Sequence, residues 1–350
     1  MSRSGFNRKT ALATVTMVLA AEAADVDVLW SFKGSIEGLQ HHRGITHSFV
    51  GVPFVAAGTL LFVWLLQRFR RKPLTGSKRT VRWGFLYFCA LLAALSHLLL
   101  DYATAYGIRL MEPFNYRWYS WDIMYIVEPL MLLALIAALA IPGLLGLVSS
   151  EVGARSRLPR GRGAAIAALV FILLLYGYRD YQHRRAVAAL NSFEYHGAAP
   201  QRVGAYPYMI NPFRWHGVVE TKNFFETVPV NSSAPDVAFN DGIQFYKPPQ
   251  SPALEAADNS YFGHVYLDWA AFPYMRVTPN PEDQPGYLVE YQDLRYTYPA
   301  AQGLAITRTS HRAPLGGFVL LNPALHVIAE GMNSNRPASM QTLDDPPDRR

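Results

Sequence analysis

The chain has few residues of the kinds that stabilise small secreted proteins or mark the common hydrolase families. Its single cysteine, Cys89, excludes an internal disulfide framework. No GxSxG, HExxH or P-loop motif occurs among its 350 residues, which argues against serine hydrolases, zincins and nucleoside triphosphatases. The net charge of +6 does not indicate nucleic-acid binding, because the basic residues are confined to particular short segments.

Apolar residues are concentrated in the first 180 positions, while the remainder is more polar and richer in proline. A helix that crosses the hydrocarbon core of a membrane needs roughly 20 apolar residues. Buried helices of a soluble protein, the alternative, would show a polar face at the helical period, and residues 48–67 show none. The sequence therefore predicts a membrane α-helical bundle of about five spans, namely residues 11–30, 48–67, 83–100, 123–148 and 163–178. The last is short, but Arg162 and Arg179 flank it and can reach the membrane surface.

Basic residues predict the orientation of these spans. Seven basic and no acidic residues lie from Arg68 to Arg82, and two further clusters precede the first span and the fifth. Basic short loops stay in the cytoplasm, and all three clusters fall on one side if every stretch crosses. We therefore expect a cytoplasmic N-terminus and an extracytoplasmic C-terminal half. The two further clusters consist of Arg3, Arg8 and Lys9, and of Arg155, Arg157, Arg160 and Arg162.

The polar residues of the spans gather on the side opposite the basic loops. A charged side chain at mid-helix costs about 2.5–3.5 kcal/mol on insertion scales, so each of these residues calls for a function. Because the orientation was derived from lysine and arginine alone, this clustering is an independent observation. The residues concerned are Asp25, Asp27, His41, His42, His47, His97, Asp101, Asp122 and Glu128.

His97 and Asp101 form the sharpest pair in this set. They stand four residues apart in SHLLLD, so both project from one face of a helix, with Cβ atoms about 5–6 Å apart. An imidazole and a carboxylate placed in this way can hold one divalent metal ion. The alternative is a hydrogen-bonded pair that serves packing alone.

The loop HHRGITHS, residues 41–48, supplies three imidazoles, an arginine and a glycine that permits a tight turn. His47 is the preferred metal ligand because it is held beside the second span, whereas His42 is either a ligand or a loop residue in water. Thr46 or Ser48 is expected to cap that span. Arg43 either clamps an anionic substrate group or contacts lipid head groups.

Four acidic residues complete the predicted cluster. Asp25 and Asp27 are two apart and point to different sides of a helix, so one is expected to contribute to the metal site while the other faces water. Asp122 either caps the fourth span or acts in the site. Glu128 is placed about two turns into the bilayer, as a ligand, a general base or a partner of Arg109 or Arg117.

These segments resemble a known family. HRGITHS, SHLLLDYATAYGIRLMEPF and RWYSWDIMYIVEP are similar to the membrane-bound metal-dependent hydrolases of the YfhP and YdjM type. WHGVVETKNFF and DLRYT resemble the extracytoplasmic half of the longer bacterial members. The resemblance implies a multi-pass membrane protein with a metal-dependent hydrolase activity. The motif residues carried over are His42, Arg43, Thr46, His47, His97, Asp101, Thr104 and Gly107, with Asp25 and Asp27 as a less distinctive acidic pair.

The start of the chain departs from that family. Its members usually begin with an additional segment that carries a Thr-His pair and a glycine- and alanine-rich stretch. Here Met1 falls at the end of that segment. We therefore expect either that the true start lies upstream or that this chain lacks one helix and one histidine ligand.

The second half has the pattern of a β-rich domain. We expect residues 1–180 to form the transmembrane domain, 181–332 an extracytoplasmic, mainly antiparallel β domain, and 333–350 a disordered tail. Residues 181–191 are expected to continue the fifth span as a helix. Alternating β-branched and aromatic runs predict one sheet of about six or seven strands. The runs are FRWHGVVE, NFFETVPV, GIQFY, YMRVTP, GYLVEYQDLRYTY, LAITRTS and GGFVLL.

The leading functional prediction is metal-assisted hydrolysis near the outer face of a bacterial inner membrane. The predicted ligands are His47, His97 and Asp101, with Asp25 or Asp27 and possible participation of His42, and the ion is zinc, manganese or iron. Glu128 or Asp122 would accept a proton from water, and Arg43 would bind substrate charge. The predicted partners are membrane lipids and an unknown small-molecule or lipid substrate, such as an ester or phosphoester, and no nucleic acid.

Two alternatives belong to other classes. In a non-catalytic membrane scaffold, the same residues would form a structural metal site or a hydrogen-bonded cluster. An ion or proton carrier is disfavoured, because the polar groups lie at one face and do not line a path through the bilayer. Structural sites are saturated by protein ligands whereas catalytic sites keep an open position, so access to the cluster distinguishes the enzyme from the scaffold.

Overall fold

The computed structural model describes residues 1–69, 80–151, 161–234, 236–280, 285–298 and 315–333. The chain forms two compact units. The first, here called the helical unit, comprises Met1–Asp27 and Arg43–Tyr181. The second, the C-terminal unit, comprises Val28–His42 and Gln182–Arg350. The chain therefore passes from the helical unit into the C-terminal unit at Val28 and returns to the helical unit at Arg43, which was not predicted.

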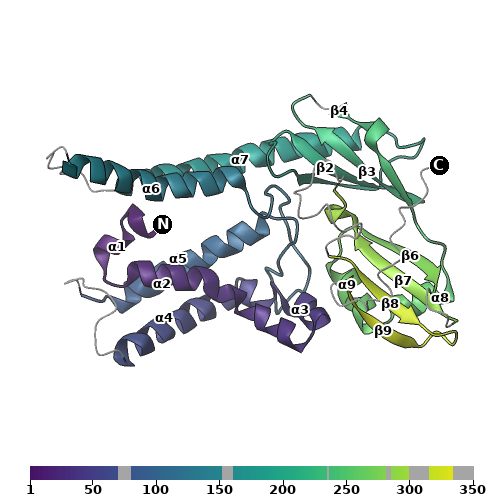
Figure 1. The fold of residues 1–350 in the computed structure, drawn as a ribbon, viewed down its shortest axis with the longest axis horizontal. Coiled ribbons are helices and arrows are strands. Elements are labelled where there is room, and N and C mark those ends of the chain that lie inside the picture. Colours follow the sequence, from purple (N-terminus) through teal and green to yellow (C-terminus); the bar gives the residue numbers. More distant parts are fainter. Residues whose placement is uncertain (70–79, 152–160, 235, 281–284, 299–314, 334–350) are drawn as a thin grey trace. The chain divides into compact units, whose positions relative to one another are not determined.

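The helical unit is built around α5, which packs against both α2 and α4 (Figure 1). Small side chains line these contacts, among them Ala56, Ala90 and the fully buried Cys89, and small residues let helix backbones approach closely in membranes. The prediction that Cys89 is a packing residue is thus confirmed. The elements are η1 Ser2–Ser4, α1 Phe6–Lys9, α2 Ala13–Glu22, η2 Ala23–Lys33, η3 Ile45–His47, α4 Gly51–Phe69, α5 Trp83–Tyr102, α6 Pro129–Glu151 and α7 Arg162–Asn191.

Among the described residues, three helices are long and apolar enough to cross a membrane: α4, α5 and α7. They correspond to the predicted spans 48–67, 83–100 and 163–178. The apolar part of α6, Pro129–Leu145, is shorter. The predicted span 11–30 divides into α2, with ten residues, and the 3-10 helix η2, with eleven. Five spans are therefore not established, while a helical membrane architecture is.

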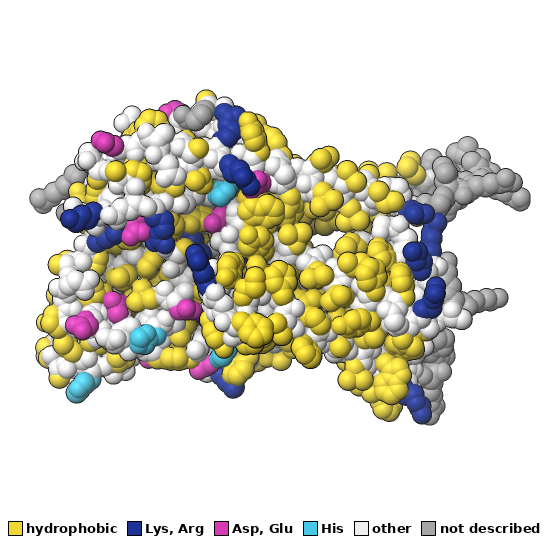
Figure 2. All heavy atoms as spheres, turned by 180° about the vertical axis from the view of Figure 1, so that it is seen from behind, with side chains coloured by type: hydrophobic (Ala, Val, Ile, Leu, Met, Phe, Trp, Pro, Cys, Tyr) yellow, Lys and Arg dark blue, Asp and Glu magenta, His cyan; other side chains and the backbone are white. Residues whose placement is uncertain are grey.

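The surface of these helices is apolar. Phe54 of α4, Leu133 of α6 and Leu173 of α7 are 73%, 61% and 67% exposed, and hydrophobic side chains cover much of the helical part of the surface in Figure 2. Large apolar side chains that face outward on long helices are typical of helices surrounded by lipid.

Several basic residues meet at one end of the helical unit. The Arg82 amide donates to Thr10 Oγ1 over 2.9 Å, the Arg162 Nε donates to the Ser4 carbonyl over 3.0 Å, and Arg3 reaches the Leu139 carbonyl. The starts of α2, α5 and α7 therefore lie together. Asp101 follows the start of α5 at Trp83 by 18 residues, which places it about 27 Å along the helix from this basic end.

The C-terminal unit contains two antiparallel sheets, where one was predicted. The first has five strands in the order β1-β2-β3-β4, with β5 also paired to β3, and the second has four in the order β6-β7-β8-β9. Helices α8 and α9 separate the sheets in sequence. The strands are β1 Arg202–Pro207, β2 Arg214–Glu220, β3 Phe224–Asn231, β4 Asp236–Val237, β5 Ile243–Tyr246, β6 Pro273–Pro279, β7 Tyr287–Asp293, β8 Gly317–Leu321 and β9 Val327–Met332.

The expected runs FRWHGVVE, NFFETVPV, GIQFY, YMRVTP and GGFVLL contain or overlap strands β2, β3, β5, β6 and β8. GYLVEYQDLRYTY forms β7 and the short helix η5, Leu294–Tyr296. The run LAITRTS, residues 304–310, and the expected tail beyond Asn333 lie outside the described residues. Strands β1 and β9 and helices α8 and α9 were not predicted.

Helices α7 and α9 pack on the two sheets of the C-terminal unit. The prediction that 181–191 continues the fifth span is confirmed, since α7 extends to Asn191 and its Ala186 and Leu190 pack on Trp215 of the first sheet. Ser251 and Ser260 cap α8, Pro252–Asp258, and α9, Tyr261–Trp269. Tyr266 of α9 packs on Tyr291 of the second sheet, with ring centroids 5.6 Å apart.

Candidate metal centre

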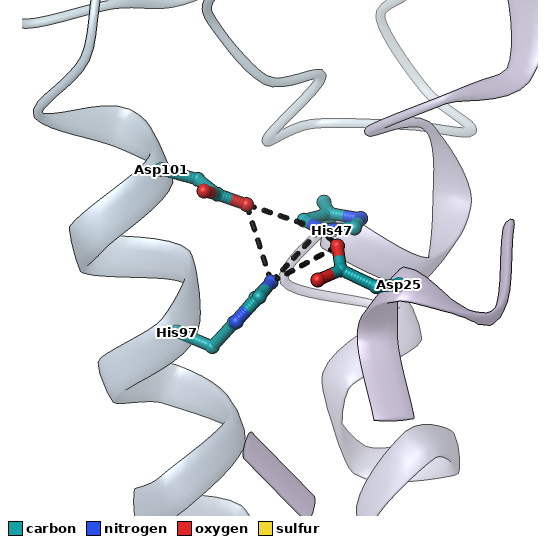
Figure 3. A group of neighbouring side chains, drawn as sticks. All are labelled: Asp25, His47, His97 and Asp101. Carbon is teal, nitrogen blue, oxygen red and sulfur yellow. Dashed lines mark hydrogen bonds and ion pairs between the residues drawn. The ribbon is translucent and has the colours of Figure 1, made fainter. Parts of the chain in front are cut away.

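Four side chains of the helical unit point toward one another at the end of α5 that lies away from the basic residues (Figure 3). His97 and Asp101 come from successive turns of α5, His47 from η3 and Asp25 from η2. One donor atom from each residue lies within 4.8 Å of all the others. The predicted pair in SHLLLD is therefore brought together with one residue from each of the two preceding segments.

The turn that carries His47 is held by its own residues. Ser48 Oγ accepts from the Gly51 amide over 2.9 Å, so Ser48 caps α4 as predicted. A Cβ atom on Gly51 would lie 1.8 Å from the Ile45 carbonyl oxygen, so this turn packs on the helix only where a glycine is present. The residue with positive φ in the loop is Arg43, at 57°, whereas Gly44 has a φ of −86°.

The distances between the donor atoms fall in a narrow range. His47 Nε2 lies 3.2 Å from His97 Nε2, 3.1 Å from Asp101 Oδ2 and 3.3 Å from Asp25 Oδ1. His97 Nε2 lies 3.2 Å from Asp101 Oδ2 and 3.4 Å from Asp25 Oδ1. Four ligands at about 2.0–2.1 Å from one tetrahedral ion are separated by about 3.3–3.4 Å. These five of the six pairs therefore have the spacing of ligands around one ion, while Asp25 and Asp101 lie within 4.8 Å of each other.

Asp101 Oδ2 is buried and has no hydrogen-bond partner of acceptable geometry, although two imidazole nitrogens approach it within 3.2 Å. The distances from the two imidazole nitrogens to Asp101 Oδ2 are thus short, but the angles do not suit N–H hydrogen bonds to this oxygen. A buried carboxylate oxygen without a hydrogen bond is costly. A cation at the centre of the group would satisfy Asp101 Oδ2 and both imidazole nitrogens together, so the residues present fit a divalent metal ion.

Asp27 lies behind His47. Its Oδ2 is 3.1 Å from His47 Nδ1, and it accepts hydrogen bonds from the Arg43 amide over 2.8 Å and from Thr46 Oγ1 over 2.9 Å. A carboxylate that accepts from one imidazole nitrogen leaves the other nitrogen available to a metal and sets the orientation of the ring. Of the acidic pair, Asp25 is therefore placed in the group of four, and Asp27 is buried behind it and does not face water.

Arg43 contacts the opposite side of Asp101. Its Nη2 is 2.9 Å from Asp101 Oδ1, its Nη1 donates to Thr104 Oγ1 over 3.2 Å, and its guanidinium lies over the ring of Tyr106. The two oxygens of Asp101 are thus divided, with Oδ1 bound to Arg43 and Oδ2 facing the imidazoles. In this arrangement Arg43 is engaged with the protein, where the sequence suggested a substrate or a lipid head group.

The carboxylates give this site a strong preference for positive charge. Burial lowers the pKa of His47, but Asp101, Asp25 and Asp27 outweigh that effect and raise it to about 10. The same electrostatic environment attracts a divalent cation, whose binding would displace protons from the imidazoles. Metal binding is therefore expected to release protons.

Comparison with known proteins agrees with this description. The family described as YdjM inner membrane protein matches residues 1–186, which is more than half of the chain. The chain belongs to the YdjM inner membrane protein family. It is also 25% identical over 129 residues to the protein named "Uncharacterized protein YfhP" of Bacillus subtilis (strain 168), and the match spans 36% of each chain. No solved structure matches.

Membership in the YdjM family, together with the apolar helices, identifies the chain as a multi-pass inner-membrane protein. The match ends within α7, so it contains the whole group of four polar residues. The chain spans about a third of the length of the YfhP protein. Neither name states an activity.

The other predicted site residues of this YdjM-family chain lie outside the group of four. His42 is the C-cap that follows α3, Ser35–His41; its amide donates to the Gly38 carbonyl, and it belongs to the C-terminal unit. Asp122, with a φ of 59°, does not cap the fourth helix, because α6 begins seven residues later at Pro129. It precedes Ile123, whose amide donates to the Ala103 carbonyl just beyond α5.

Glu128 differs most from its predicted environment. Helix α6 begins at Pro129, since proline fits the first turn of a helix and not its interior. Glu128 is the residue directly before this helix. It is therefore not two turns into a helix. Its Oε2 lies 2.7 Å from Nη2 of Arg179, and both side chains are buried. The partner is thus neither Arg109 nor Arg117.

The sequence reasoning missed Arg179 as an interior residue and took it as a flank of the fifth span. The available signal was an arginine about three-fifths of the way along a long apolar helix. A charge at that position requires a buried partner, and Glu128 was one of the acidic residues that could supply it.

Proposed function

We propose that this YdjM-family protein is a membrane-bound metal-dependent hydrolase that acts near the outer face of the inner membrane. The observation that carries the proposal is the group formed by Asp25, His47, His97 and Asp101, whose donor atoms are separated by 3.1–3.4 Å in the five pairs given above. Two imidazoles and two carboxylates suit zinc, manganese or iron. A bound ion of this kind supplies a Lewis acid and lowers the pKa of water.

The surrounding residues have distinct roles in this proposal. Asp27 holds the His47 ring so that Nε2 faces the centre, and Arg43 holds Asp101 so that only Oδ2 does. Of the two predicted proton acceptors, Glu128 is engaged with Arg179. Asp122 remains the candidate general base, because its neighbour Ile123 bonds to the end of α5.

Exposure of the group favours an enzyme over a structural metal site. The side chain of Asp25 is 44% exposed, whereas those of His47, Asp101 and His97 are 0%, 12% and 14% exposed. The centre is thus enclosed on the side of α5 and open on the side of Asp25. Water could reach a bound ion from that side as a fifth ligand, which would supply the open position that a catalytic metal site requires.

The proposed location follows from the two ends of the helical unit. The basic residues meet at one end, and the group of four lies about 27 Å away along α5. If the basic end is cytoplasmic, the centre is at the outer face and the C-terminal unit is extracytoplasmic. Exposed apolar side chains such as Val26, Phe49 and Leu100 adjoin the centre in sequence, and this supports a lipid or envelope ester or phosphoester as the substrate.

Hydrolysis by the purified full-length chain in lipid nanodiscs tests this function. The probes are bis(p-nitrophenyl) phosphate, p-nitrophenyl butyrate and phosphatidic acid, each with zinc, manganese or iron(II). We expect metal-dependent turnover of at least one probe that falls at least about 100-fold in His97→Ala and persists in His326→Ala, a change of an exposed histidine in the C-terminal unit. Metal binding without turnover of any probe class would instead support the scaffold alternative.

A further inference from the structure

Residues 28–42, here called the excursion, connect the two units between the segments that form the metal centre. Asp25 and Asp27 lie directly before the excursion, and Arg43 and His47 lie directly after it. The excursion itself belongs to the C-terminal unit. Two of the four grouped residues, Asp25 and His47, are therefore attached in sequence to a segment that packs elsewhere.

The excursion is internally braced. Trp30 stacks on His41 with ring centroids 4.1 Å apart, and Lys33 Nζ lies 4.0 Å from the centroid of Trp30. His41 Nε2 lies 3.4 Å from Glu37 Oε2, one turn earlier on α3. A segment with stacked ends and a side-chain contact along its helix transmits a displacement better than a flexible linker of the same length does.

Helix α3 of the excursion packs against α9 and β9 of the C-terminal unit. The Tyr261 hydroxyl, at the start of α9, lies 2.8 Å from Glu37 Oε1 and 2.5 Å from Gln40 Oε1, and its single proton is donated to one of these two acceptors at a time. The adjacent Phe262 amide donates to Glu330 Oε2 of β9 over 2.9 Å. The surface that receives α3 is thus held by the second sheet.

One carboxylate oxygen, Oδ2 of Asp27, connects the residue before the excursion with the residues that follow it. Asp27 Oδ2 accepts from the Arg43 amide and from Thr46 Oγ1, and it lies 3.1 Å from His47 Nδ1. A shift of either end therefore changes the position of Asp27 relative to His47. Asp25, two residues before the first end, moves with it.

We infer that the C-terminal unit positions Asp25 and His47 through the excursion, and that Tyr261 is the positioning residue at its docking site. The inference rests on the proposed metal centre and adds a second region that sets its affinity. Because coupling between two binding equilibria is reciprocal, metal binding must also strengthen the docking of α3.

The test compares zinc binding and hydrogen exchange in the full-length chain in detergent. Tyr261→Phe removes the hydroxyl at the docking site, and the double variant Glu37→Ala/Gln40→Ala removes its acceptors from the other side. Tyr287→Phe, a half-exposed tyrosine on β7 of the same unit, is the matched control. We expect both docking variants to bind zinc about fivefold or more weakly, within the range typical of coupled sites. We also expect zinc to slow amide exchange in residues 35–41 of the wild type.

Unchanged zinc affinity in both docking variants, or exchange in 35–41 that does not respond to zinc, would overturn this inference and leave the metal centre intact. A wild-type chain that binds no zinc, manganese or iron would remove the metal centre and this inference together. Combining Tyr261→Phe with the double variant should produce no further loss, because all three residues act through one contact.

Discussion

The helical unit and the C-terminal unit each bury a cluster of charged side chains, but they satisfy those charges differently. In the C-terminal unit, Arg295 donates to Asp293 through Nε and to the Trp269 carbonyl through Nη2. Asp293 also accepts from the Ala271 amide. In the helical unit, Asp101 Oδ2 has no hydrogen bond of acceptable geometry despite two imidazole nitrogens nearby. The first cluster is satisfied as a structural ion pair, whereas a cation at its centre would satisfy the second.

The two units also place their aromatic and aliphatic residues differently. The C-terminal unit buries Trp215, Tyr266 and Tyr291, as a water-soluble core does, whereas the helical unit exposes Phe54 and Leu173. A buried charge in a membrane bundle is harder to explain by packing alone. The contrast therefore supports the proposal that the His and Asp group is the functional element, and the following substitutions test that contrast.

Loss of one imidazole from the centre is expected to have the largest effect. His97→Ala removes a proposed ligand and should weaken zinc affinity by more than about 1,000-fold, beyond the roughly 10–100-fold typical of an outer contact. Competition with a chromophoric chelator measures this, with His326→Ala as the control. Comparable affinity in the two variants would show that His97 is not a ligand.

Breaking the structural pair should affect stability and leave metal binding unchanged. Arg295→Leu leaves the Asp293 carboxylate buried, and we expect it to lower the free energy of unfolding of the C-terminal unit by about 3–5 kcal/mol. The control is Arg276→Leu, whose partner Glu290 lies 2.7 Å away on the same sheet but whose own side chain is 38% exposed. That change should cost less than about 1 kcal/mol. Equal costs, measured by urea unfolding, would contradict the distinction.

Acid should weaken the C-terminal unit through His216. This histidine is fully buried between the sheets, where burial lowers its pKa to about 4 and a hydrogen bond from Nε2 to the Leu294 carbonyl offsets only part of that effect. Because the folded-state pKa lies below the unfolded value of 6.5, the contribution of His216 is present above pH 6.5 and is lost as the pH falls toward 4. The loss amounts to roughly 3 kcal/mol.

His216→Gln, which retains a donor for Leu294, provides the comparison. It should flatten the dependence of unfolding free energy on pH between 6.5 and 4, measured by urea unfolding at each pH. The same slope in the variant and the wild type would assign the acid sensitivity to other groups.

The orientation of His47 should produce the smallest of these effects. Asp27→Asn keeps an acceptor near the Arg43 amide but removes the charge beside His47 Nδ1. We expect zinc affinity to fall about 10–100-fold, with stoichiometry retained. Isothermal titration calorimetry measures both quantities, and an unchanged affinity would show that Asp27 does not orient the ligand.

The parts of the centre that were predictable from sequence depend on local geometry. His97 and Asp101 share a helix face because they are four residues apart, and the basic loops placed both at one end of the bundle. The choice between Asp25 and Asp27 was not predictable, because it depends on the 3-10 geometry at the start of η2 and on the hydrogen bonds of the returning loop at Arg43 and Thr46. These are tertiary contacts, which residue spacing does not encode.

The sequence predicted that the C-terminal half contains antiparallel strands, but it did not predict that these strands form two sheets. Alternation along FRWHGVVE and NFFETVPV identified β2 and β3, whose residues pair in antiparallel register. The division into two sheets depends on α8 and α9, whose short apolar stretches resemble strands or loops in sequence. Similarly, the pairing of Glu128 with Arg179 joins residues 51 positions apart, and the nearer Arg109 and Arg117 were the natural but wrong candidates.

X-ray absorption at the zinc edge, on full-length protein loaded with one equivalent of zinc in detergent, tests the central claim most directly. The account predicts four protein ligands and one water as nitrogen and oxygen neighbours at about 2.0–2.2 Å, with the outer-shell scattering of two imidazoles, and loss of one imidazole contribution in His97→Ala. Failure to retain zinc, or a zinc environment without histidine, would contradict it.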